Sequence, residues 1–156
     1  MTSIPVEYLP IFAPFMQAPP VDVLACARVV GLPIYSVDLP HGVSGMIKRK
    51  PDSTFECYVD ASEPSVRQRF TAAHELGHFI LHHSSIGQTH QDNYRLRAEG
   101  MTNYQETEAN RFAADLLMPR NLISNAIAHG TTSVPALAQL FQVSEIAMSI
   151  RLGLPT

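Results

Sequence analysis

Several common features are missing from this sequence of 156 residues. It has only two cysteines, Cys26 and Cys57, which lack the C-x-x-C spacing and cannot form a disulfide framework, so we expect buried thiols in a reducing compartment. No run approaches the roughly 18 apolar residues that a membrane-spanning helix requires. The N-terminal stretch also lacks the basic segment of a signal peptide, because the first basic residue is Arg28. We therefore expect a cytoplasmic protein without a membrane anchor.

Charged residues are also few, at 16% of the chain, and neither sign is in large excess, because the net charge is −3. Without a basic excess, the composition does not favour non-specific binding of nucleic acid or of a membrane surface. The unusual residue is histidine, because four of the seven histidines fall between His74 and His83. Such a local bias favours a metal site or a proton-transfer site.

The hydrophobic pattern predicts an α+β protein. Residues 1–20 are interrupted by prolines and are expected to form an extended arm. From residue 62 the apolar spacing changes to the helical period, whereas residues 84–101 are polar and without pattern and are expected to be a loop. The expected regular elements are helix 22–30, strands 34–39, 45–50 and 54–60, helices 62–83 and 103–117, and C-terminal helices near 120–128, 133–141 and 144–152.

The segment His74-Glu75-Leu76-Gly77-His78 forms an H-E-x-x-H pattern inside the helix expected at 62–83. Histidines four positions apart lie one turn apart on the same helical face, so both imidazoles can reach one tetrahedral zinc ion. Glu75 is rotated by about 100° from His74, which suits a carboxylate that holds the water of a zinc site rather than the metal. The alternative is a hydrogen-bonded pair of core histidines.

A catalytic zinc ion requires a third protein ligand and an open fourth position. No third histidine follows at a suitable spacing, so we expect a carboxylate from the helix 103–117. Glu106 is favoured, because Asn110 then lies at i+4 on the same face and can hydrogen-bond a ligand imidazole. Glu108 is the alternative donor, although most helix glutamates are simply solvated.

The other histidines carry weaker signals. His82 lies about 12 Å along the helix from His74, which is too far for both to bind one ion. We expect His82 to contact one of the metal-binding side chains without binding the metal itself, or to cap the helix end. His83 and His90 are expected to be exposed, and His129 carries no signal.

Three segments, RQRFTAAHELGHFILHH, ETEANRFAADLLMP and VSEIAMSIRL, together resemble the ImmA/IrrE-type metallopeptidases. The resemblance covers about residues 22–152. It implies a small antiparallel or mixed sheet packed against a zincin-like helix that bears HExxH, followed by a C-terminal helical bundle. We accordingly expect one metallopeptidase domain over 1–156, with the arm at 1–20, a catalytic core at 21–119 and a helical lobe at 120–156.

The resemblance also implies the chemistry of the site. It implies a Zn²⁺ ion held by His74, His78 and, through the E-x-x-A-N pattern, Glu106, with Glu75 as the catalytic base. The implied activity is limited proteolysis of a cytoplasmic protein, a helix-turn-helix transcriptional repressor or the antitoxin of a toxin–antitoxin pair.

Two parts of the mechanism stay open at this level. The candidates for the second group that stabilises the oxyanion are Tyr58, Tyr94 and His82. The strand 54–60 is a candidate for aligning an extended substrate by edge pairing, so that backbone hydrogen bonds position the target.

Two other functions compete with the peptidase. Residues 136–152 have the pattern of a helix-turn-helix, with a short link between two helices. However, Arg151 is the only arginine or lysine in 121–156, so we do not expect direct nucleic-acid binding. The second alternative is a zinc-binding regulatory or toxin-like partner of a helix-turn-helix protein that performs no proteolysis. An intact Glu75 argues against it, because a structural metal site does not need that residue.

Overall fold

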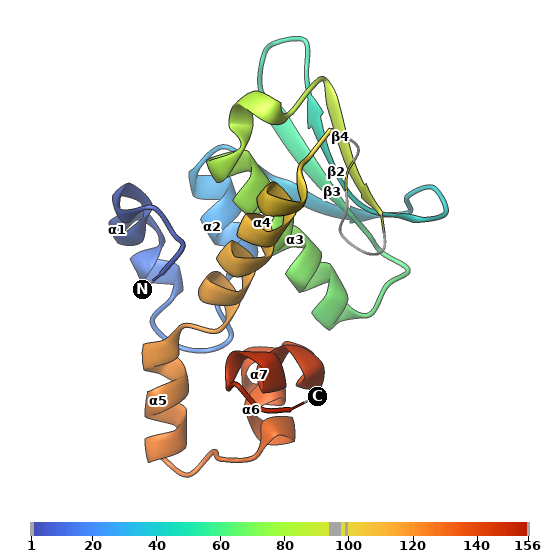
Figure 1. Cartoon of the computed structure of the whole chain (residues 1–156). Coiled ribbons are helices and arrows are strands. Elements are labelled where there is room, and N and C mark those ends of the chain that lie inside the picture. Colours follow the sequence, from blue (N-terminus) through green and yellow to red (C-terminus); the bar gives the residue numbers. More distant parts are fainter. Residues whose placement is uncertain (1, 94–97, 99, 156) are drawn as a thin grey trace.

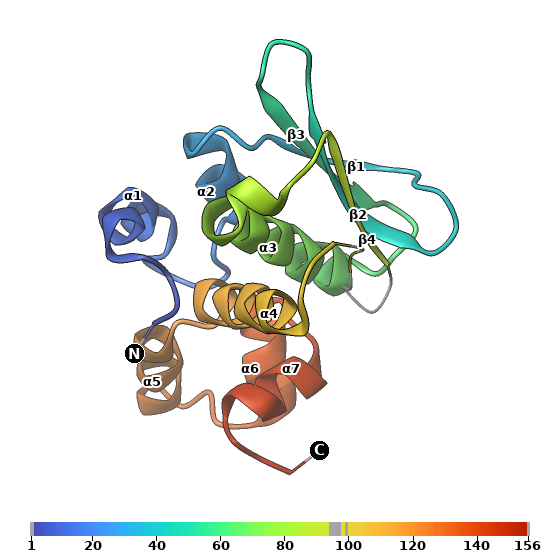
Figure 2. The ribbon, with the colours of Figure 1, turned by 45° about the horizontal axis from the view of Figure 1, so that its top comes forward.

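A mixed sheet covers one side of a long helix, and a second long helix packs against the other side (Figure 1, Figure 2). The computed structural model describes residues 2–93, 98 and 100–155, to which all structural statements below refer. The strands are β1 (Ile34–Val37), β2 (Val43–Arg49), β3 (Phe55–Asp60) and β4 (Thr89–Asn93). The two long helices are α3 (Ser65–Leu81) and α4 (Asn103–Leu117). The expected α+β class and the small mixed sheet are confirmed.

The strands pair in the order β1-β3-β2-β4, with β1 parallel to β3 and β2 antiparallel to both β3 and β4. In β3, Phe55, Cys57 and Val59 are buried, as their alternation in the sequence predicts. The expectation that strand 54–60 offers an edge to a substrate is wrong, because β3 has a neighbour on each side. Among the described strands, the free edges belong to β1 and β4.

The central helix α3 is buried along much of its length. Every residue from Thr71 to His78 is buried, because the sheet covers one side of the helix and α4 covers another. The helix begins at Ser65, after Pro64, rather than at residue 62 as expected. At Gly77 an added Cβ would lie 3.1 Å from a ring carbon of Phe112, so the glycine permits the close approach of α3 and α4.

The second long helix, α4, has the bounds that the sequence predicts. A capping box fixes its start: the Thr102 hydroxyl accepts from the Gln105 N–H at 3.1 Å, and the Gln105 side chain accepts from the Thr102 N–H at 3.0 Å. One turn later the helix buries Glu106, together with the apolar side chains Ala109 and Phe112. The capped first turn therefore presents a carboxylate to the interior.

The N-terminal segment is not the extended arm that its prolines suggest. It forms short helical turns, which are a 3₁₀ turn at Val6–Tyr8, α1 at Leu9–Phe12 and a further 3₁₀ turn at Ala13–Phe15. Proline is tolerated in the first turn of a helix, where its missing N–H has no intrahelical partner, and Pro10 and Pro14 occupy such positions. α2 (Val23–Val29) follows and packs on α3.

The C-terminal helices lie beyond α4, on the side away from the sheet (Figure 2). They are α5 (Arg120–Ala128), α6 (Val134–Phe141) and α7 (Glu145–Arg151), close to the expected ranges. Two arginines join them to the core: Arg151 pairs with Asp115 of α4 at 2.8 Å, and Arg69 of α3 donates to the Gln142 carbonyl at 3.2 Å. None of the described helices is both long and apolar enough to cross a membrane.

The stretch 84–101 is not a loop throughout. The structure forms a 3₁₀ turn at His83–Ser85 and the strand β4 at Thr89–Asn93. The strand has no hydrophobic alternation, because all of its five residues, THQDN, are polar. Burial alternates instead: His90 and Asp92 are buried and the other three residues are exposed. The expectation that His90 is exposed is therefore wrong.

The close contact between β2 and α3 at Gly45 is testable. An added Cβ at Gly45 would lie 2.7 Å from Thr71 Cγ2 and 3.2 Å from Glu75 Cγ. We expect Gly45→Ala to lower the free energy of unfolding by about 1–3 kcal/mol through overpacking, measured by chemical denaturation. Adding Thr71→Ser, which removes the colliding methyl group, should recover part of the loss. Gly87→Ala is the control, because no atom lies within 4 Å of its added Cβ. Unchanged stability in Gly45→Ala would contradict this packing.

Candidate metal centre

The two histidines of the H-E-x-x-H pattern converge with Glu106 in the buried space between α3 and α4. His78 Nε2 lies 3.1 Å from His74 Nε2 and 2.6 Å from Glu106 Oε1, and His74 Nε2 lies 3.4 Å from Glu106 Oε1. In a tetrahedral zinc site with bonds of roughly 2.0–2.1 Å, neighbouring donor atoms are separated by about 3.3 Å. Two of the three separations, 3.1 and 3.4 Å, match this spacing, whereas the 2.6 Å between His78 Nε2 and Glu106 Oε1 is a hydrogen-bond distance.

Contacts outside this trio orient the two imidazoles. His74 Nδ1 lies 2.8 Å from Asn110 Oδ1, an oxygen that only accepts, so Nδ1 carries the proton. The predicted contact between Asn110 and a histidine of the pair is confirmed. His78 Nδ1 lies 2.9 Å from His82 Nδ1, and His82 Nε2 lies 2.9 Å from Glu108 Oε1.

This network leaves the inner nitrogens free for a metal. Since His82 Nε2–H donates to the Glu108 carboxylate, His82 Nδ1 accepts from His78 Nδ1–H. When a metal takes the place of the proton on each inner nitrogen, the lone pairs of His74 Nε2 and His78 Nε2 face the centre, which is the tautomer that zinc-ligating imidazoles adopt. His82 has the expected outer position, in contact with His78.

The two candidate carboxylates on α4 lie in different environments. Glu106 Oε1 contacts the paired imidazoles, and its Oε2 accepts from the Ala98 N–H at 2.5 Å. Glu108, one-third exposed, instead contacts the outer nitrogen of His82. The structure therefore brings Glu106, and not Glu108, to the two inner nitrogens.

Glu75 lies beside this cluster and is fully buried. Neither of its carboxylate oxygens has a hydrogen-bond partner within the described structure, and Oε2 lies 3.6 Å from His90 Nε2. Burial, together with the nearby Asp92 and Glu106 carboxylates, raises the pKa of Glu75 well above its usual value. A carboxyl group placed in this way can accept and release a proton inside the site.

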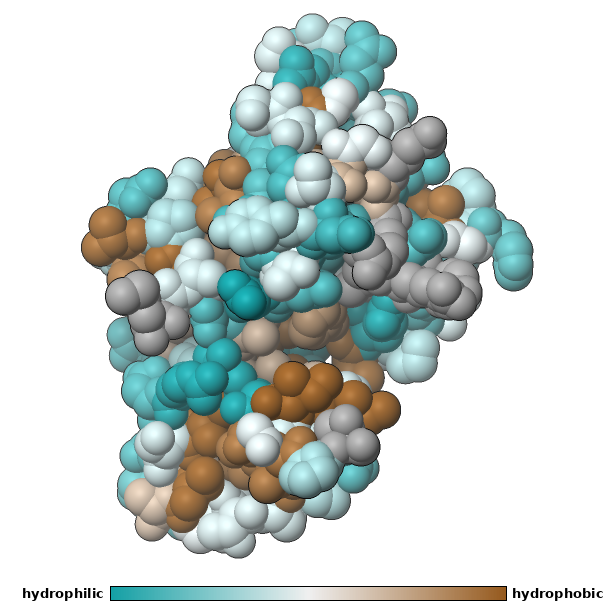
Figure 3. Space-filling model, viewed as in Figure 1, coloured by the Kyte–Doolittle hydropathy of each residue, from teal (hydrophilic) through white to brown (hydrophobic). Residues whose placement is uncertain are grey.

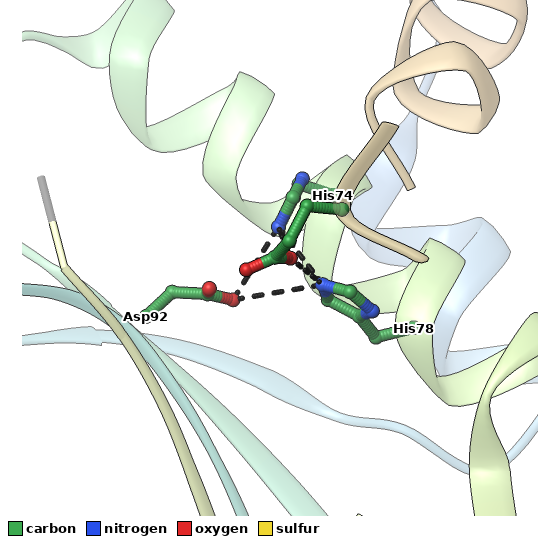
Figure 4. Close-up of side chains that lie close together, drawn as sticks. His74, His78 and Asp92 are labelled. Carbon is green, nitrogen blue, oxygen red and sulfur yellow. Dashed lines mark hydrogen bonds and ion pairs between the residues drawn. The ribbon is translucent and has the colours of Figure 1, made fainter. Parts of the chain in front are cut away.

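The structure places two further residues at the site, Asp92 and His90, which the sequence did not mark as site residues. Asp92 points from β4 toward α3, with Oδ2 at 3.4 Å from His74 Nε2 and 4.0 Å from His78 Nε2 (Figure 4). His90, on the same face of β4, lies 3.2 Å from Asp92 Oδ2. The i, i+2 spacing of a histidine and an aspartate was the signal that could have found them, because such residues share one face of a strand.

The electrostatics of the cluster suit a cation. Burial lowers the pKa of His74, but its contacts with Asp92 and Glu106 outweigh this effect and raise it to about 9. Burial raises the pKa of Glu106, but the bonds from His74 and His78 outweigh it and lower the pKa to about 2. In His78 burial has the largest effect, and it lowers the pKa below the usual value.

A divalent cation would complete this site. The carboxylates of Glu75, Asp92 and Glu106 are all buried, and no lysine or arginine contact to them is found among the described residues. Three of their oxygens, both of Glu75 and Oδ1 of Asp92, have no hydrogen-bond partner there. Because buried polar groups are costly unless they are paired, a bound metal fits both the donor atoms and the carboxylate oxygens that have no partner in the described part of the chain.

Of the three candidates for the oxyanion stabiliser, the structure describes Tyr58 and His82, and both have other hydrogen-bond partners. Tyr58 alternates with the buried residues of β3, and its hydroxyl bonds Glu56 instead. Tyr94 lies outside the described residues. Both ring nitrogens of His82 are engaged, by His78 and by Glu108. In this structure the Tyr58 hydroxyl is therefore engaged away from the centre.

The family model described as the IrrE N-terminal-like domain, a peptidase family, matches residues 47–153. The chain belongs to this family. The radiation response metalloprotease IrrE of Deinococcus radiodurans is 31% identical over 170 aligned positions, which cover 94% of this chain and 50% of IrrE. The chain thus spans about half the length of this relative.

Among solved structures, a Mycobacterium tuberculosis transcriptional regulator is similar to this member of the IrrE-like family. The two share a TM-score of 0.60 and 18% sequence identity, over 85% of this chain and 39% of the regulator. At this identity the similarity shows a shared fold.

The bond between Asn110 and His74 predicts an effect on metal affinity. Asn110→Ala removes the acceptor that orients the imidazole, and we expect about 10–100-fold weaker metal binding, measured by competition with a chromophoric chelator. Asn110→Asp keeps an acceptor oxygen and should bind metal nearly as the wild type does. Equal affinities of the alanine variant and the wild type would show that the contact does not orient a ligand.

Proposed function

We propose that this chain is a zinc-dependent endopeptidase that performs limited proteolysis of a cytoplasmic protein. The observation that carries the proposal is the convergence of His74 Nε2, His78 Nε2 and Glu106 Oε1, with the buried Glu75 beside them. Two imidazoles and one carboxylate are the donor set of several catalytic zinc sites. Membership of a metallopeptidase family supports the same chemistry.

Within this proposal His74, His78 and Glu106 hold the zinc ion, and Glu75 is the catalytic base. When bound, the ion polarises the scissile carbonyl and makes a water molecule more acidic. Glu75 takes the proton from the attacking water and delivers it to the leaving amine. Burial of Glu75 among the strands and helices keeps bulk water from competing for that proton.

We propose that the substrate binds as an extended segment, which can add to the edge of a sheet through backbone hydrogen bonds. β4 lies beside the centre and is an outer strand among the described ones, and we assign it the role of pairing with the substrate backbone. We propose a helix-turn-helix repressor or antitoxin as the target, as the family resemblance implies.

The C-terminal helices support protein contacts better than nucleic-acid contacts. In α7, Ile146 and Ile150 are 67% and 65% exposed. Figure 3 shows apolar side chains gathered over this end of the molecule. A recognition helix for DNA presents basic and amide side chains to phosphates and base edges, so we assign these helices no direct nucleic-acid role.

Glu75→Gln tests the proposed function. We expect it to lower the rate at which the enzyme cleaves a helix-turn-helix protein from a neighbouring gene by at least about 100-fold, because general base catalysis is lost. Zinc content, measured by mass spectrometry of the purified protein, should stay at the wild-type level. Glu7→Gln changes an exposed glutamate and is the matched control.

Two results would contradict the proposal. One is cleavage by Glu75→Gln at the wild-type rate. The other is a Glu75→Gln variant that no longer cleaves but still acts on the helix-turn-helix protein in cells as the wild type does. That result would support the alternative of a zinc-binding regulatory or toxin-like partner.

A further inference from the structure

Asp92 places a fourth donor atom at the metal centre. We propose that Asp92 is a fourth protein ligand of the metal, and that its carboxylate would take the coordination position that a catalytic site leaves for water. The inference rests on the proposed function in taking the inner nitrogens of His74 and His78 and the Glu106 carboxylate as the other three ligands.

Asp92 and Glu106 lie equally far from one imidazole but not from the other, because Glu106 Oε1 is 2.6 Å and Asp92 Oδ2 is 4.0 Å from His78 Nε2. Asp92 Oδ2 and Glu106 Oε1 both lie 3.4 Å from His74 Nε2. The donor atoms of His74, His78, Asp92 and Glu106 all lie within 4.8 Å of one another. Four atoms at such separations can surround one ion, and the set of two nitrogens and two carboxylate oxygens suits zinc and other divalent metals.

A role for Asp92 in holding His90 alone does not account for this placement. Asp92 Oδ2 contacts His90 Nε2 at 3.2 Å, but the same oxygen also faces His74 Nε2. Asn110 takes the outer nitrogen of His74, so the inner nitrogen has a lone pair for a metal. The Asp92 side chain is fully buried and its Oδ1 has no hydrogen-bond partner in the described structure, which leaves a buried carboxylate short of partners.

An irregularity in the sheet aims Asp92 at the centre. In the pairing of β2 with β4, Val43 lies opposite Asn93 and Gly45 lies opposite Asp92, so the register shifts at this point. Such bulges bend a strand and redirect side chains, often next to active sites. Gly45 has no side chain to fill the space between β2 and Glu75, so the sheet approaches α3 closely where Asp92 projects.

Four protein ligands are typical of closed, structural zinc sites, whereas catalytic sites keep one position open. The arrangement with Asp92 in place is therefore a latent form of the site. Among the described strands β4 pairs with β2 alone, so release of Asp92 would disrupt one ladder of this part of the sheet. Pairing of a substrate segment with the free edge of β4 would act on the same strand.

The test compares Asp92→Ala and Asp92→Asn with the wild type and with Gln91→Ala, which alters an exposed neighbour on the same strand. In the Co²⁺-substituted protein, loss of a ligand should change the visible absorption spectrum in both Asp92 variants and not in Gln91→Ala. Zinc affinity, from chelator competition, should fall at least about tenfold, and cleavage per bound zinc should rise. Asp92→Asn preserves the side-chain volume and gives the same readout if Asp92→Ala does not fold.

Unchanged spectra and affinities would overturn the assignment of Asp92 as a ligand. Lower cleavage per bound zinc in the Asp92 variants would overturn the claim that it blocks the water position. The metal readouts need no substrate, so they separate this inference from the proposed function. If the Asp92 variants change the Co²⁺ spectrum but the wild type, with Glu75 intact, cleaves no substrate, Asp92 is a metal ligand and the proposed peptidase function is wrong.

Discussion

The structure depends on the burial of acidic and imidazole groups in one place, between α3, α4 and β4. Three carboxylates from three different elements meet three imidazoles there, with both inner nitrogens of the H-E-x-x-H pair facing inward. Burying so many ionisable groups is unfavourable unless they are paired. The hydrogen bonds to Asn110, His82 and Ala98 offset part of this cost, and a bound divalent cation would offset much of the rest.

The scaffold around the cluster follows from this requirement. α3 must lie close to both neighbours for groups on α4 and β4 to meet its histidines. Glycine allows the approach on both sides, at Gly77 toward α4 and at Gly45 toward the sheet. The capping box at Thr102 fixes the first turn of α4 and with it the position of Glu106. Small residues and a helix cap thus set the geometry of the site as much as the ligands do.

Local patterns made part of this structure predictable. The i, i+4 histidines of α3 and the pairing of Glu106 with Asn110 are periodic features of single helices, and the structure brings these side chains together. The bounds of α4 were predictable because its cap and its apolar face lie within one continuous segment.

Non-local pairing made the rest unpredictable. β4 contains only polar residues, so the hydrophobic pattern could not reveal the strand that carries His90 and Asp92. The central position of β3 depends on β1 and β2, which pair with it on opposite sides. The extended arm expected from the prolines of residues 1–20 is wrong, because Pro10 and Pro14 begin helical turns instead of preventing them.

The most direct measurement for the metal centre is the metal content of two α4 variants, Glu106→Ala and Glu108→Ala, purified beside the wild type and loaded with one equivalent of zinc. We expect about one bound zinc ion per chain in the wild type and in Glu108→Ala, since Glu108 contacts His82 and not the inner nitrogens. Glu106→Ala should show a clear loss of zinc. Retention of zinc by Glu106→Ala together with its loss from Glu108→Ala would contradict the centre described for this chain.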